Sequence, residues 1–77
     1  MRKLRQVSDW REIVGTNVRR FRQAAGITQE QLAFAAEIDL TYVGGIERGK
    51  RNPSVLVLAR IADALAVEPA ILLQQTE

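Results

Sequence analysis

Two helix-forming segments near the middle of the chain are joined by only about three residues, Glu37 to Asp39. The first segment, residues 28–37, starts with Thr28 and has Gln31 three residues later, the pattern of a capping box that satisfies two backbone amides. The second segment, residues 40–48, has apolar residues at helical spacing. A connection this short makes two helices cross steeply, so the pair sets the geometry around which the rest of the chain must pack.

The helix predicted over residues 40–48 has two different sides. Asp39 is a good N-cap for it and Gly49 ends it. Its inner side carries Val43, Ile46 and Glu47, whereas its outer side carries only short side chains or none, at Thr41, Gly44 and Gly45. In a helix-turn-helix the second helix lies at the surface and fits the major groove of DNA. A bare outer side therefore predicts close approach to base edges.

The remaining apolar residues also follow helical spacing, with no strand-like alternation over a useful length. Three further helices are predicted: residues 9–25 with Ser8 as N-cap or a later start near Ile13, residues 55–66 after Ser54, and a short segment from Pro69 to about Leu73. Trp10 and Phe34 are expected to pack against the core. The fold class predicted is all-α, with five short helices around one core.

The chain of 77 residues is one small domain whose core is marginal. We expect a flexible basic tail over residues 1–8 and a single domain over residues 9–77. The chain has no cysteine and no histidine, so it lacks disulfides, thiolate ligands, and the usual general base and metal ligand. There is also no phosphate-binding glycine loop after a strand. The sequence therefore predicts no enzyme, no metal and no cofactor.

The net charge is only +2, but it is unevenly distributed. Residues 1–26 hold seven Arg or Lys against two acids, and residues 27–47 hold four acids and no base. Arg48, Lys50 and Arg51 then add three positive charges within four positions. Two separated basic clusters suggest an anionic partner met on one face. The alternative is that these charges are ordinary solvated surface.

Three segments of the chain, GTNVRRFRQAAGITQEQLA, YVGGIERGKRNPS and LARIADALAV, occur in an order and at separations that resemble a known family. Residues 14–73 resemble the phage repressor and Cro family of helix-turn-helix regulators, the XRE family. The resemblance implies a five-helix, lambda-repressor-like DNA-binding domain. It further implies a sequence-specific transcriptional regulator, a repressor that binds a palindromic operator in double-stranded DNA as a homodimer through the major groove.

The resemblance also implies roles for individual residues. The base-facing positions are Leu40, Thr41, Gly44 and Gly45. The phosphate contacts are Thr28, Gln29, Tyr42, Arg48, Lys50, Arg51 and Asn52, with covering of the core edge as the alternative for Tyr42. Arg22 and Glu47 match a structural ion pair. None of the four base-facing residues has a long polar side chain, so specificity is expected to lean on DNA shape and on the flanking basic residues.

The C-terminal third carries more apolar surface than one small core needs, since Leu56, Val57, Ile71 and Leu72 include positions off the inner stripe. Exposed apolar clusters usually mark an interface, and the resemblance implies a two-fold dimer here. We predict these four residues as the dimer interface, with a monomer as the alternative.

Two further expectations concern partners and location. The chain opens on no signal-peptide pattern and has no apolar run near the ~18 residues that span a bilayer, so we expect a cytoplasmic protein without membrane contact. The basic tail would either enter a minor groove or stay disordered. The alternative function is a protein-interaction module on the same fold, antitoxin-like or an adaptor, with weak or no specific DNA binding and a partner protein still to be identified.

Overall fold

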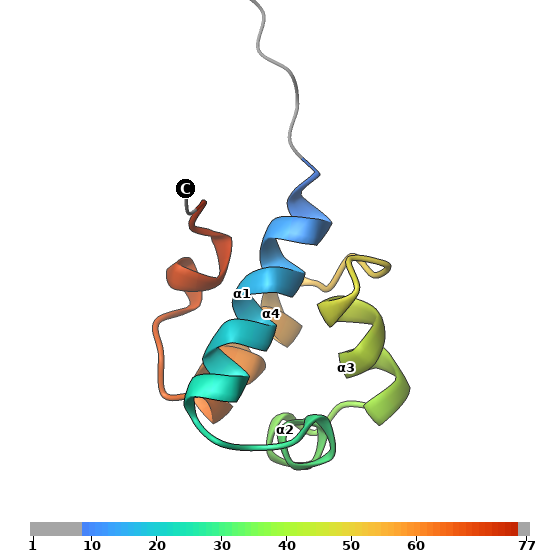
Figure 1. Cartoon of the computed structure of the whole chain (residues 1–77), viewed down its shortest axis with the longest axis vertical. Coiled ribbons are helices and arrows are strands. Elements are labelled where there is room, and N and C mark those ends of the chain that lie inside the picture. Colours follow the sequence, from blue (N-terminus) through green and yellow to red (C-terminus); the bar gives the residue numbers. More distant parts are fainter. Residues whose placement is uncertain (1–8, 76–77) are drawn as a thin grey trace, which may run out of the picture.

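The computed structural model describes residues 9–75, and within them it contains helices and no strand (Figure 1). The elements in chain order are α1 (Trp10–Ala24), α2 (Gln29–Ala36), α3 (Leu40–Glu47), α4 (Val55–Ala64) and the 3-10 helix η1 (Pro69–Leu73). The all-α class is therefore confirmed. Residues 1–8 and 76–77, which include the predicted tail and the Ser8 cap, lie outside the described residues.

The predicted count of five helices is wrong, because the last segment is a 3-10 helix and not an α-helix. Its backbone bonds span three residues, from the Ile71 amide to the Glu68 carbonyl at 3.0 Å and from the Gln74 amide to the Ile71 carbonyl at 3.3 Å. A segment of five residues is too short to gain much from α-helical bonds, and the tighter 3-10 turn is common in such short pieces.

Side chains define the starts of all four α-helices. The Asp9 carboxylate accepts a bond from the Arg11 amide at 3.1 Å, so the N-cap of α1 is Asp9 and not the predicted Ser8, and the helix does not start near Ile13. The Arg11 side chain also donates to Asp9 and thereby lowers the pKa of that carboxyl. The caps of the other three helices are as predicted: the capping box of Thr28 and Gln31, then Asp39, then Ser54.

The helices end where the backbone turns left-handed. Gly26 and Gly49 both have φ of 73°, as expected for residues that close a helix. α4 ends at Ala64, two residues earlier than predicted, because Ala66 has φ of 58° and the Val67 amide bonds back to the Ala62 carbonyl at 2.9 Å.

α1 starts at the N-terminal end of the described chain and lies between α3, packed against one side, and η1, packed against the other (Figure 1). The approach of α1 to α3 depends on Gly15, which is buried. A Cβ atom at this position would collide with the Ile46 carbonyl oxygen and lie 3.0 Å from the Glu47 carbonyl oxygen. The helices are thus in backbone-to-backbone contact, which fixes the depth at which α3 sits.

The core is built from residues of all five elements, α2 included. Its buried apolar residues are Val14, Val18, Leu32, Ala33, Ala36, Val43, Ile46, Leu58, Ile61, Ala62, Leu65 and Leu72. Asn17 is the one buried polar residue among the described ones, with 1% of its surface exposed. Its amide donates to the carbonyl oxygens of Leu72 at 3.0 Å and Gln74 at 2.8 Å, which joins α1 to the end of η1.

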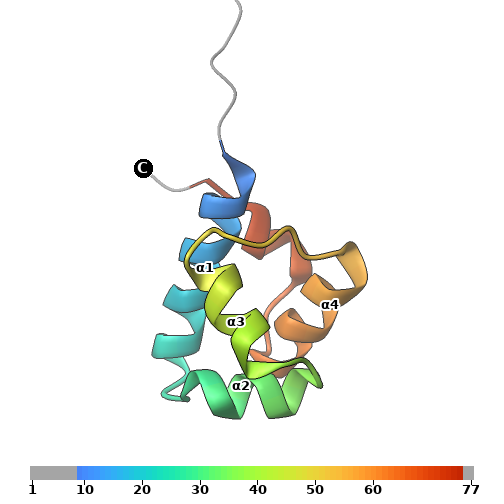
Figure 2. The same ribbon diagram turned by 90° about the vertical axis from the view of Figure 1, so that its right-hand side faces the viewer.

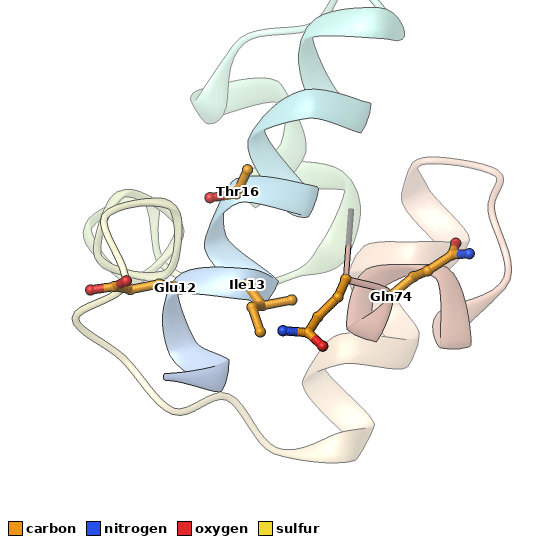
Figure 3. Close-up of a pocket in the computed structure, with 5 residues that line it drawn as sticks. Glu12, Ile13, Thr16 and Gln74 are labelled. Carbon is orange, nitrogen blue, oxygen red and sulfur yellow. The ribbon is translucent and has the colours of Figure 1, made fainter. Parts of the chain in front are cut away.

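A hollow lies beside this joint, between the first turns of α1 and the residues after η1 (Figure 3). Glu12, Ile13, Thr16, Gln74 and Gln75 line it, and Glu12 is the single ionisable side chain among these described residues. None of the helices in residues 9–75 has both the length and the apolar character needed to cross a bilayer.

Candidate nucleic-acid interface

The turn between α2 and α3 is as short as the sequence predicted. α2 ends at Ala36, its C-cap Glu37 has φ of 59°, and the Ile38 amide closes the turn on the Ala33 carbonyl at 3.0 Å. Asp39 then caps α3, so only three residues separate the helices. α3 rises from the end of α2 at a steep angle and faces the viewer in Figure 2. This is the arrangement of a helix-turn-helix, with α3 as the second helix.

The inner side of α3 is held by an ion pair between Arg22 and Glu47. The guanidinium binds both carboxylate oxygens, with Nε at 2.7 Å and Nη2 at 3.1 Å. The side chains expose only 13% and 3% of their surface. The bond to Glu47 raises the pKa of Arg22, which therefore stays charged. The ion pair implied by the resemblance is thus present, and it connects α1 to α3.

Gln29 adds a third element to this connection. Its side-chain amide donates to Oε1 of Glu47 at 2.9 Å, so the first residue of α2 binds the last residue of α3. The remaining donor of Arg22, Nη1, binds the Ile27 carbonyl at 2.9 Å. Glu47 thus accepts from α1 and α2 at once, and α3 is fixed relative to both helices.

The outer side of α3 is not bare. Gly44 and Gly45 are both buried, because the side chains of Arg48 and Arg51 lie over them. A Cβ atom at Gly45 would lie 2.7 Å from Cγ of Arg51, and one at Gly44 would lie 3.0 Å from Nη1 of Arg48. Helical periodicity could not reveal this cover, because Arg51 belongs to the loop after the helix.

The other predicted base-facing residues lie at the start of α3. Leu40 and Thr41 are exposed, with Leu40 among the large apolar residues that the described surface presents. Tyr42 is half-buried and packs against the core edge, while the guanidinium carbon of Arg51 lies 5.4 Å from the centre of its ring. Covering the core and contacting Arg51 are both structural roles, and a phosphate contact by Tyr42 stays a prediction.

The predicted phosphate-binding residues outside α3 lie in two places, the loop after α3 and the start of α2. Arg48, Lys50, Arg51 and Asn52 are exposed in and next to the loop after α3. Within residues 9–75 no carboxylate pairs with these three cations. Thr28 is exposed at the start of α2, where its hydroxyl oxygen accepts from the Gln31 amide at 3.0 Å. Unpaired cations next to a helix N-terminus are chemically suited to phosphate.

The predicted dimer residues do not form a single exposed set. Leu56 is 75% exposed, and Val57 and Ile71 are half-buried. Leu72 has no exposed surface and belongs to the core, so its placement in the interface is wrong. Three residues per turn rotate η1 differently from an α-helix, which turns Leu72 inward and leaves Leu73 exposed.

Other exposed apolar residues were missed or wrongly placed by sequence reasoning. Val55 is 77% exposed beside Leu56, and Trp10 and Leu73 border a hollow that Pro53 and Leu58 also line. Phe34, expected to cover the core, is 87% exposed on α2. Position alone does not tell whether an aromatic ring on a short helix points inward, because α2 has little amphipathic pattern.

Comparison with known proteins agrees with this geometry. The family profile described as "Helix-turn-helix" matches residues 18–72. The uncharacterized HTH-type transcriptional regulator y4dJ of Sinorhizobium fredii is 38% identical over 69 residues, covering 90% of each chain. The control protein C.BamHI of Bacillus amyloliquefaciens is 40% identical over 67 residues, covering 86% of this chain and 83% of the relative.

A solved structure extends the likeness to the fold. The restriction-modification controller protein C.AhdI from Aeromonas hydrophila is 44% identical, with a TM-score of 0.78 over 80% of this chain and 94% of that one. The present chain therefore belongs to the XRE-type helix-turn-helix family, a class of DNA-binding transcription regulators.

Proposed function

We propose that this member of the helix-turn-helix family is a sequence-specific transcriptional repressor that binds a palindromic operator as a homodimer. In this proposal α3 enters the major groove, and Leu40, Thr41 and the surface over Gly44 and Gly45 face the base edges. The protein works in the cytoplasm, where its DNA lies, and acts by occupying DNA and not by catalysis. Its similarity to named controllers of restriction-modification supports a gene-regulatory target.

The observation that carries the proposal is the contrast between a fixed α3 and the free cations beside it. Glu47 ties α3 to α1 and α2, while Arg48, Lys50 and Arg51 pair with no carboxylate in the described chain. A fixed helix presents a defined shape, and unpaired cations release counterions when they meet phosphate. Thr28, Gln29, Tyr42 and Asn52 would add phosphate contacts at the same edge.

Dimerisation is the second part of the proposal. Leu56, Val57 and Ile71 remain in the proposed interface, and Leu73 replaces the buried Leu72. These residues come from α4 and η1, whose apolar surface is larger than a monomer of this size needs. A two-fold dimer would set two copies of α3 about 34 Å apart, one turn of DNA.

The proposal is tested by fluorescence anisotropy on a labelled duplex of random sequence at ~50 mM salt, where affinity for phosphates alone is retained. We expect binding that weakens steeply as salt is raised. Absence of binding at this salt, or binding that salt does not change, would contradict DNA binding through the cationic loop.

A protein-interaction module is the second candidate, and the exposed Phe34 is the observation that favours it. The ring lies on α2, and Phe34 is not among the residues proposed for DNA contact or for the dimer interface. If this candidate were correct, the parent protein would show no DNA binding in the same anisotropy assay. The Phe34→Ala variant would also lose binding to the partner protein. Nonspecific DNA binding by the parent protein decides against it as the sole function.

A further inference from the structure

Three successive atoms of the Arg51 side chain, Cγ, Cδ and Nε, lie against Gly45. A Cβ atom on Gly45 would lie 2.7 Å from Cγ of Arg51, 3.4 Å from Cδ and 3.0 Å from Nε. Contact below 3.0 Å with a mid-chain carbon is not relieved by moving the tip of the side chain. Any residue other than glycine at position 45 would therefore displace the whole Arg51 stem.

The backbone brings Arg51 back to this place. Gly49 has φ of 73°, and the Lys50 amide binds the Gly45 carbonyl at 2.8 Å. The loop after α3 is thus bonded to the turn of the helix that contains Gly45. Residue 51 follows at once, so its exposed side chain starts next to the glycine and runs along the surface of the helix.

The far end of Arg51 has its own contact. Its guanidinium carbon lies 5.4 Å from the centre of the Tyr42 ring, within the range of a cation–π interaction. Tyr42 precedes Gly45 by three residues, so both lie on the same face of α3. Arg51 is therefore held at two points, its stem at Gly45 and its head at Tyr42.

Arg48 lies over Gly44 in a different way. Only the tip of its side chain comes close, with Nη1 at 3.0 Å and Cζ at 4.0 Å from a Cβ atom placed on Gly44. The tip of an arginine moves away at little cost. Gly44 is therefore a matched control for Gly45, since the two glycines are neighbours in the same helix.

We propose that Gly45 and Tyr42 are positioning residues that hold Arg51 against α3 before DNA is bound. The proposal deepens the proposed function and rests on it. Arg51 then supplies the long polar side chain that Leu40 and Thr41 lack, and its fork of donors suits a pair of acceptors on DNA, either phosphate oxygens or a guanine edge. An arginine ordered in advance loses less conformational freedom on binding.

The first test measures DNA affinity of Gly45→Ala, Arg51→Ala and the double variant at ~50 mM salt. Alanine favours the helix, so Gly45→Ala keeps or raises the melting temperature. We expect it to weaken binding about 2- to 12-fold, the loss that corresponds to ordering one arginine on binding. In the Arg51→Ala background the Gly45→Ala change should have no further effect, whereas any loss from Gly44→Ala, which does not touch Arg51, should be the same with and without Arg51.

Two results would overturn the proposal. One is an equal loss from Gly45→Ala with and without Arg51, which would mean that the glycine itself faces DNA. The other is unchanged DNA affinity in Arg51→Ala. If Arg51→Ala weakens binding to every DNA sequence equally, the acceptor is phosphate. If it weakens binding to one DNA sequence only, the acceptor is a base edge. Both results support the proposal.

The second test needs no DNA and so separates this proposal from the proposed function. In the free protein the Tyr42 ring should shift the Arg51 side-chain proton resonances upfield in NMR spectra. The shift should vanish in Gly45→Ala and Tyr42→Leu and persist in Gly44→Ala and Tyr42→Phe. Random-coil Arg51 shifts in the parent protein would overturn the positioning role, whereas failure to bind DNA with these shifts present would overturn only the proposed function.

Discussion

The two sides of α3 differ in what they contact and therefore in what a substitution does. The inner side meets backbone and buried charge, at Gly15 and at the ion pair of Arg22 with Glu47. At its two glycines the outer side meets only side chains, those of Gln29, Arg48 and Arg51. The inner side is therefore required for folding, and the outer side is available for a ligand. Inner substitutions should unfold the protein, and outer ones should change DNA binding alone.

The largest effect is expected at Glu47. Glu47→Ala leaves the Arg22 guanidinium buried without its partner and removes the acceptor of Gln29, so it should reduce the free energy of unfolding by about 3–5 kcal/mol. Urea denaturation followed by circular dichroism measures the loss. Glu30→Ala, at an exposed position of α2, is the control and should change little. A loss below about 1 kcal/mol at Glu47 would show that the pair behaves as a surface pair.

Gly15 and Gly44 give the sharpest comparison, because the same substitution by alanine should lower the free energy of unfolding at Gly15 and leave it equal or higher at Gly44. Gly15→Ala forces a methyl group into the backbone of α3 and should destabilise the fold by about 3 kcal/mol, as overpacking does. Gly44→Ala meets the tip of Arg48 and, at an ordinary contact distance of 3.7 Å, Oε1 of Gln29, so it should be neutral or stabilise by up to about 1 kcal/mol through helix propensity. Equal unfolding free energies for the two variants would remove the distinction between the sides.

The exposed apolar residues test whether two copies of the protein form a dimer, which would present the outer sides of two α3 helices to the same DNA. Leu56→Asp should yield monomers in analytical ultracentrifugation with little loss of folding, since Leu56 is 75% exposed. Phe34→Asp replaces an even more exposed ring on α2 and should leave the dimer intact. A dimer that persists in Leu56→Asp, or dissociates in Phe34→Asp, would contradict the proposed interface.

The smallest effect per residue is expected from the cations. Replacing Arg48 and Lys50 with alanine should weaken binding to all sequences and reduce the slope of log affinity against log salt by about 0.9 per lost phosphate contact. Melting temperatures should not change, because neither side chain supports the core. Arg19→Ala, an exposed cation on α1, is the control. An unchanged slope in the double variant would remove both residues from the DNA surface.

The sequence was sufficient to predict the elements of the fold whose causes are local. Helix starts depend on a side chain two or three residues from the amide that it binds, so Thr28 and Ser54 were recognisable as caps. The steep crossing of α2 and α3 followed from the short turn between them. The pairing of Arg22 with Glu47 came from the family resemblance, because a distance of 25 residues has no local signal.

The features that the sequence did not predict depend on distant or loop geometry. Asn17 binds carbonyls 55 and 57 residues away, which no spacing rule indicates. Leu72 was assigned to the dimer interface because it lies in an apolar cluster with Ile71, but in η1 its side chain turns into the core. The cover over Gly45 arises from the path of the loop after Gly49, so the glycine pair looked bare in the sequence although arginines lie over it.

Selection of bound sites from a pool of random duplex DNA tests the central claim most directly. A dimer that presents two copies of the outer side of α3 should enrich inverted half-sites whose centres lie about one turn, 10–10.5 base pairs, apart. Arg51→Ala protein taken through the same selection should enrich them less. Pools that show no enriched sequence, or only single half-sites without inverted symmetry, would contradict sequence-specific binding by a homodimer.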